Sequence, residues 1–108
     1  YYKKALQVRT LIQREFDRAL EGRDLILAPV APTTAYRIGE KTSDPLQMYL
    51  GDVCTVPVNI AGLPALSLPC GEDRDGLPVG MQLIGKAYSE ALLYRAGYAF
   101  EQAGKEDR

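Results

Sequence analysis

The first part of the chain has the apolar periodicity of a helix. Between Tyr2 and Leu20 apolar residues recur at spacings of three and four, which gathers their side chains along one stripe of an α-helix. Gly22 then ends the pattern. At about 1.5 Å per residue this helix is roughly 30 Å long, so we expect part of its surface to serve sequence outside this chain. The stripe consists of Ala5, Val8, Leu11, Ile12, Phe16, Ala19 and Leu20.

A continuous apolar run over residues 25–28 follows, between Asp24 and Pro29. Such a run is typical of a short strand that is buried on both faces, so we expect a central strand. Prolines and threonines up to Thr34 end it, and the polar stretch up to Pro45 predicts a long loop. Loops of this length are often binding or lid segments, although plain mobility is the commoner explanation.

The region from Leu46 to Ile60 predicts two short helical pieces. It mixes helix formers with Gly51 and Pro57, and Thr55 lies where it would cap the second piece. Proline is tolerated in the first turn of a helix, because the N–H groups there have no partner within the helix. We therefore place the break between the two pieces near Thr55.

The last third predicts a hairpin and a final helix. Apolar strands over 65–69 and 79–84 flank a turn signal at 75–78, and Ser89 opens a helix that runs to Gly104. The fold class is therefore α/β, with a small mixed sheet covered by helices. A length of 108 residues favours a single domain, 1–108.

The charge balance argues against direct nucleic-acid binding. The chain has thirteen Lys and Arg residues and fourteen Asp and Glu residues, which gives a net charge of −1. It therefore has no excess of positive charge to neutralise phosphates. No apolar run approaches the roughly 20 residues that cross a bilayer, and the amino terminus has no cleavage pattern of a signal peptide. We expect a cytoplasmic protein that does not bind a membrane.

The candidate chemistry is sparse. Without histidine, the chain cannot contain a Ser-His or Cys-His mechanism, and Cys54 and Cys70 cannot complete a normal zinc site. We expect both cysteines to be buried free thiols. Asp52 is unusual because it lies among apolar neighbours, where burying an ionised carboxylate without a cationic partner is costly. It is either a helix cap or surface ion pair, or a carboxylate at a cleft wall that recognises an ammonium group.

Two long segments carry a family resemblance. Residues 49–71, YLGDVCTVPVNIAGLPALSLPCG, and residues 76–85, GLPVGMQLIG, resemble the carboxy-terminal end of amidase-signature enzymes. Four further segments are similar, within this family, to the A subunits of glutamyl-tRNA(Gln) amidotransferases. They are residues 1–5, 8–12, 38–41 and 44–49.

The resemblance implies a role in glutamine hydrolysis. In this family the A subunit hydrolyses glutamine with a Ser-Ser-Lys triad and sends ammonia to a partner subunit, which uses ATP and Mg to amidate Glu-tRNA(Gln). The triad matches nothing in this chain, so the resemblance implies no catalytic residue, cofactor or metal ion within it and no activity of the piece alone. The implied partners are glutamine and the B and C subunits, and an open apolar edge would favour self-association of the isolated piece.

One functional residue carries over from the family motif. The aspartate that holds the α-ammonium of glutamine corresponds to Asp52, while the arginine that grips the α-carboxylate would precede Tyr1. Losing the aspartate would cost roughly 1.5 to 3 kcal/mol of binding, as for other charge-assisted hydrogen bonds. The family's loop near the pocket is similar to Pro29, Pro32, Thr33 and Thr34 of this chain, and a rigid strand exit explains these residues at least equally well. Another amidase-signature amide hydrolase, or a non-catalytic binding module, remains the alternative.

Overall fold

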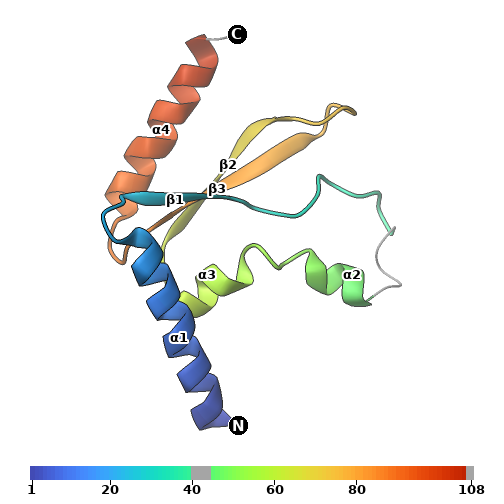
Figure 1. The fold of residues 1–108 in the computed structure, drawn as a ribbon. Helices are drawn as coiled ribbons and strands as arrows, with labels where there is room; N and C mark the ends of the chain where they lie inside the picture. Colours follow the sequence, from blue (N-terminus) through green and yellow to red (C-terminus); the bar gives the residue numbers. More distant parts are fainter. Residues whose placement is uncertain (40–44, 107–108) are drawn as a thin grey trace.

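Among the residues that the structure describes, four helices and three strands follow the predicted order (Figure 1). The structure is a computed structural model that describes residues 1–39 and 45–106. The final helix runs past Gly104, its predicted end, because a glycine inside a helix costs only about 1 kcal/mol and does not stop it. The elements are α1 (Tyr2–Leu20), β1 (Leu25–Pro29), α2 (Pro45–Leu50), α3 (Val56–Ala61), β2 (Ala65–Glu72), β3 (Pro78–Gly85) and α4 (Glu90–Glu106).

The three strands form one antiparallel sheet in the order β1-β3-β2. Strands β2 and β3 are the predicted hairpin, and their register pairs Ser67 with Gln82. A bulge interrupts this pairing between Pro69 and Gly71, which leaves Cys70 without a partner in the ladder. On its other side β3 pairs with β1, where Gln82 lies opposite Ala28. Gln82 is therefore in the middle strand of the sheet.

The prediction that residues 25–28 form a central strand is wrong for the described sheet. Strand β1 is at the edge, and β3 takes the central place because it alone pairs on both sides. The apolar run predicted cover on both faces, yet Leu27 is 68% exposed. Sequence composition reports how apolar a strand is, whereas its place in the sheet depends on which other strands pair with it.

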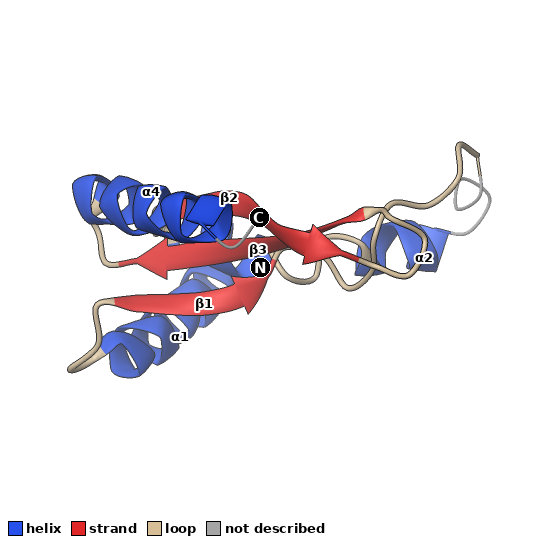
Figure 2. Ribbon diagram, turned by 90° about the horizontal axis from the view of Figure 1, so that it is seen from above, coloured by secondary structure: helices blue, strands red, loops and turns tan. Residues whose placement is uncertain are grey.

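Helices cover the sheet on both faces (Figure 2). Side chains alternate along a strand, so Met81 and Leu83 point to one face of β3 while Gln82 and Ile84 point to the other. Helix α4 packs on the first face, where Leu68, Met81, Leu83 and Leu93 form the core cluster. Helix α1 contacts β1 and packs against α3, and both lie on the second face (Figure 1).

The molecule is thin and broad. Its principal extents are 49 × 41 × 16 Å, and its radius of gyration is 16.2 Å, whereas a compact domain of this length has about 13 Å. Large apolar side chains consequently stay uncovered on both long helices. They include Leu6, Val8 and Leu11 of α1 and Tyr94, Tyr98 and Phe100 of α4.

Candidate functional site

The candidate site is the turn between α2 and α3, which carries Asp52. The main-chain carbonyl of Asp52 accepts hydrogen bonds from the N–H groups of Thr55 and Val56, each at 3.1 Å. Thr55 is the N-cap residue of α3, as its position predicts, but its side chain does not cap the helix. Its hydroxyl instead donates to the Asp52 carbonyl at 3.4 Å, because the Thr55 backbone is already helical at φ −109° and ψ −28°.

The side chain of Asp52 is exposed to solvent. The desolvation cost that made this residue unusual in the sequence therefore does not arise within this chain. Among the described residues the Asp52 carboxylate has no hydrogen-bond or ion-pair partner. Within these residues Asp52 is therefore neither a side-chain helix cap nor part of a surface ion pair. A carboxylate without a protein partner keeps its full capacity to accept hydrogen bonds from a ligand.

A buried glutamine supports this turn from the sheet. The side chain of Gln82 is 2% exposed, and its amide nitrogen donates to the carbonyl of Cys54 at 2.8 Å and to that of Pro29 at 3.0 Å. The patterns along the sequence did not single out Gln82. The available signal was a polar residue in the middle of the apolar strand over 79–84, a position that requires hydrogen-bond partners when it is buried.

Helix α1 fixes the other end of α3. The Arg9 side chain donates to the carbonyl of Ile60 at 3.0 Å, and the Gln13 amide donates to that of Ala61 at 3.4 Å. Gly62 then ends α3 at φ 72°, where its N–H bonds back to the last turn. The last carbonyls of a helix lack partners within it, so these contacts satisfy the end of α3 and tie it to α1.

The exit of β1 is held by the β2–β3 hairpin. The Thr34 hydroxyl donates to the carboxylate of Asp73 at 2.7 Å, whose other oxygen accepts the N–H groups of Asp75 and Leu77. The hydrogen bond from Thr34, followed by that from the Leu77 N–H, holds the pKa of Asp73 below its ordinary value of 3.8. For Thr34 this geometry favours the rigid strand exit over direct contact with a ligand.

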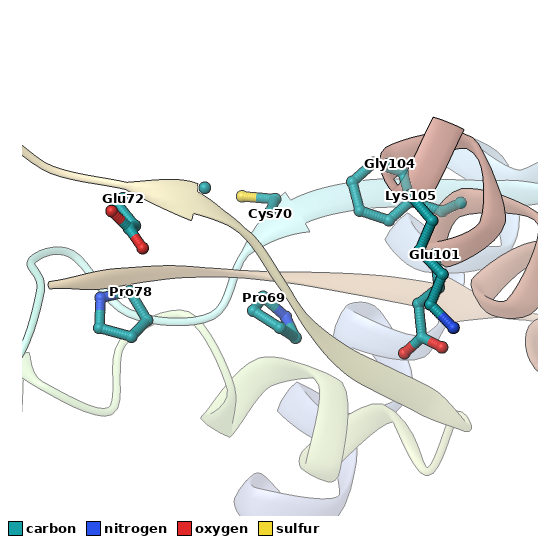
Figure 3. A pocket seen from close by; sticks show the side chains of 9 residues that line it. Pro69, Cys70, Glu72, Pro78, Glu101, Gly104 and Lys105 are labelled. Carbon is teal, nitrogen blue, oxygen red and sulfur yellow. The ribbon is translucent and has the colours of Figure 1, made fainter. Parts of the chain in front are cut away.

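A hollow lies on the other side of the sheet, between the β2 bulge and the end of α4 (Figure 3). It has a volume of about 350 Å³ and is lined by Cys70, Glu72, Glu101 and Lys105, among others. Cys70 is exposed, so the expectation of a buried thiol is wrong for it, because the bulge takes this residue out of the strand pairing. Cys54 is a free thiol that is half-buried.

Neither a metal centre nor a membrane helix emerges from the described residues. No group of three or more Cys, Asp or Glu side chains in residues 1–39 and 45–106 is arranged to hold a metal ion. Within the same residues, no helix has the length and apolarity that a membrane span requires. The hollows beside Cys70, Tyr36 and Arg9 do not include Asp52 in their walls.

Known proteins resemble the chain over nearly its whole length. The A subunit of glutamyl-tRNA(Gln) amidotransferase from Moorella thermoacetica is 60% identical over 108 residues, which are 100% of this chain and 22% of that protein. The crystal structure of the same subunit from Thermotoga maritima superimposes with a TM-score of 0.81 at 45% identity. The match covers 88% of this chain and 21% of that one.

A hydrolase with a different name shares the fold. The allophanate hydrolase of Kluyveromyces lactis superimposes with a TM-score of 0.71 at 30% identity, over 87% of this chain and 15% of that structure. The chain spans about a fifth of the length of the amidotransferase relatives that it matches. The amidase family model matches residues 1–94. With most of its residues inside that match, this chain belongs to the amidase family.

Proposed function

We propose that the chain is the carboxy-terminal part of the glutaminase subunit of a glutamyl-tRNA(Gln) amidotransferase. The whole enzyme would convert Glu-tRNA(Gln) to Gln-tRNA(Gln) in the cytoplasm and take its ammonia from glutamine. The observation that carries the proposal is the 60% identity over all 108 residues with the A subunit of Moorella thermoacetica. Identity to the allophanate hydrolase structure is half as high, at 30%, which favours the amidotransferase.

In this proposal the chain contributes substrate binding rather than bond cleavage. The Ser-Ser-Lys triad of the family has no counterpart in the matched motifs, so these 108 residues would act as one structural unit of a longer catalytic protein. Glutamine would bind to this longer protein. ATP and Mg would be used by one of its partners, and the B and C subunits would complete the ligase.

Asp52 is our proposed contact for the α-ammonium of glutamine. Two features of the turn support this role, namely a main chain fixed by the bonds to the Asp52 carbonyl and a carboxylate exposed to solvent. An ammonium group donates three hydrogen bonds and carries the opposite charge, so it suits a carboxylate that has no other partner among the described residues. The contact would gain strength where the rest of the longer protein excludes water from the site.

The test is Asp52→Asn in the full-length protein, in complex with its partners. The substitution keeps the shape of the side chain and removes its charge, so kcat/KM for glutamine should fall roughly 10- to 150-fold, the equivalent of about 1.5 to 3 kcal/mol. Ammonia release measures the rate. Asp24→Asn is the matched control, because Asp24 is also an exposed aspartate but lies between α1 and β1, away from the turn.

Three results would contradict the proposal. Glutaminase kinetics that Asp52→Asn leaves unchanged would exclude Asp52 from ammonium binding. A full-length enzyme that prefers simple aliphatic or aryl amides to glutamine would instead be another amidase-signature hydrolase. A protein with no amidase activity at all, which binds a ligand of its own, would be the non-catalytic module.

A further inference from the structure

Gln82 has an exceptional position within the sheet. Among the side chains of residues 1–39 and 45–106 whose burial is described, Gln82 is the only polar or charged one that is buried. It is 2% exposed. It lies on β3, paired with Ala28 on one side and with Ser67 on the other. Paired strands on both sides make this backbone one of the best-fixed parts of the molecule. A polar group at such a position requires hydrogen bonds in return for the water that it loses.

The two partners of Gln82 determine which way its amide points. The main-chain carbonyls of Cys54 and Pro29 lie 2.8 Å and 3.0 Å from the side-chain nitrogen. Both are acceptors, so only the NH₂ end of the amide satisfies them, and its two hydrogen atoms provide one donor for each. Neither a methionine of similar length nor a glutamate can make this pair of bonds.

These bonds connect the sheet to the candidate site. Cys54 lies two residues after Asp52, inside the turn whose main chain is closed by hydrogen bonds to the Asp52 carbonyl. Pro29 is the last residue of β1, next to the segment that Thr34 anchors on the hairpin. Helix α3 packs mainly on α1, so the Gln82 bond is a direct polar link between this turn and the central strand. The bond therefore ties the Asp52 turn to β3.

We infer that Gln82 is a positioning residue for the ammonium-binding carboxylate of Asp52. The inference rests on the proposed function, because it assigns Gln82 a role only through Asp52. Gln82 does not touch the ligand. It holds the turn at the depth and angle at which the carboxylate meets the substrate amine, and a displacement of about 1 Å is enough to weaken such a contact strongly.

The experiment compares glutamine with 5-amino-5-oxopentanoate, which is glutamine without its α-amino group. The ratio of kcat/KM for these two substrates isolates recognition of the ammonium group from the rest of catalysis. It is measured by ammonia release with the full-length assembled enzyme, for the wild type, Asp52→Asn, Gln82→Met and the double variant. Leu93→Ala is the control, because it removes a buried side chain on the opposite face of the sheet and lowers stability without touching the turn.

We expect Asp52→Asn to lower the ratio roughly 10- to 150-fold and Gln82→Met to lower it roughly 5- to 50-fold. The Gln82 effect should come from KM for glutamine, with kcat little changed. The double variant should match Asp52→Asn alone, because the loss of positioning has no effect once the charge is gone. Leu93→Ala should keep the wild-type ratio.

The two proposals fail in distinguishable ways. A ratio that falls in Asp52→Asn but stays at the wild-type value in Gln82→Met overturns the positioning role and leaves the proposed function intact. A ratio that Asp52→Asn does not change overturns both the ammonium contact of Asp52 and the positioning role of Gln82. If Gln82→Met does not fold, Gln82→Asn retains the amide on a side chain one methylene shorter, which cannot reach both carbonyls. An unchanged ratio in Gln82→Asn would overturn the positioning role as well.

Discussion

Leu93 on α4 offers a direct test of how this thin fold is held together. Its side chain is 3% exposed and packs in the cluster with Leu68, Met81 and Leu83. Leu93→Ala removes three carbon atoms, which at about 0.8 kcal/mol each gives about 2.4 kcal/mol for the transfer term alone. A cavity term raises measured losses for this substitution to as much as about 5 kcal/mol.

The structure places the expected value in the lower part of that range. The cluster lies under a single helix, and Leu27, on the same face of the sheet, is 68% exposed. Neighbouring side chains can therefore move into the space, and a site that collapses loses less than a rigid one. We expect Leu93→Ala to cost about 2 to 3.5 kcal/mol.

Hydrogen exchange measured by mass spectrometry in the full-length protein is the appropriate assay, because it reports the opening of α4 in place. The expected loss corresponds to an exchange rate roughly 30- to 300-fold higher for the amides of α4, since 1.4 kcal/mol is a factor of ten. Tyr94→Ala is the control. Tyr94 is the next residue on the same helix and loses more atoms, but it is 67% exposed, so its loss should stay below about 1 kcal/mol. Equal effects of the two substitutions would refute the assignment of the core to this face of the sheet.

Two further predictions concern turns. The Thr34 hydroxyl and the backbone N–H groups lower the pKa of Asp73 in the folded protein. The stability that this carboxylate contributes should therefore be complete at pH values above its ordinary pKa of 3.8. It should be lost as the pH falls through the lowered pKa of the folded protein. Hydrogen exchange in the hairpin turn, measured as a function of pH, checks this loss of stability. Asp73→Asn should remove the pH dependence. The same loss of stability at acid pH in Asp73→Asn would exclude Asp73 as its cause. Gly62→Ala should destabilise the protein by about 1 to 2 kcal/mol in thermal unfolding, because Gly62 has a φ of 72°. An added Cβ meets nothing closer than 3.8 Å, so this substitution measures backbone strain without a steric clash. Gly104→Ala, inside α4 with open space around it, should have the opposite sign, and equal signs for the two would contradict the reasoning.

Local features of the sequence predicted most of the secondary structure. The three- and four-residue spacing over 2–20 predicted α1 with both of its ends, since it depends only on which residues share a helix face. Turn residues predicted the β2–β3 hairpin for the same reason. The end of α4 was placed at Gly104 because a glycine late in a helix is a common stop signal, but the helix continues to Glu106.

The candidate site was predictable only in part. The family motif singled out Asp52, and its role in binding stays a prediction. The sequence offered no means to connect the turn to Gln82, because 28 residues separate Cys54 from Gln82 along the chain. Similarly, nothing local linked Thr34 to Asp73, which are 39 residues apart. Hydrogen bonds of this kind exist only once the strands have paired, so no pattern along the chain contains them.

The sequence by itself determined the elements, their order and the family, because these depend on side-chain periodicity, on turn chemistry and on motifs read along the chain. Tertiary structure alone decided that β3 rather than β1 is the middle strand, that Cys70 is exposed at a bulge, and that a buried glutamine holds the turn of Asp52. Each of these depends on which distant segments meet. These contacts form only when the whole chain buries its apolar faces and pairs its buried polar groups in hydrogen bonds.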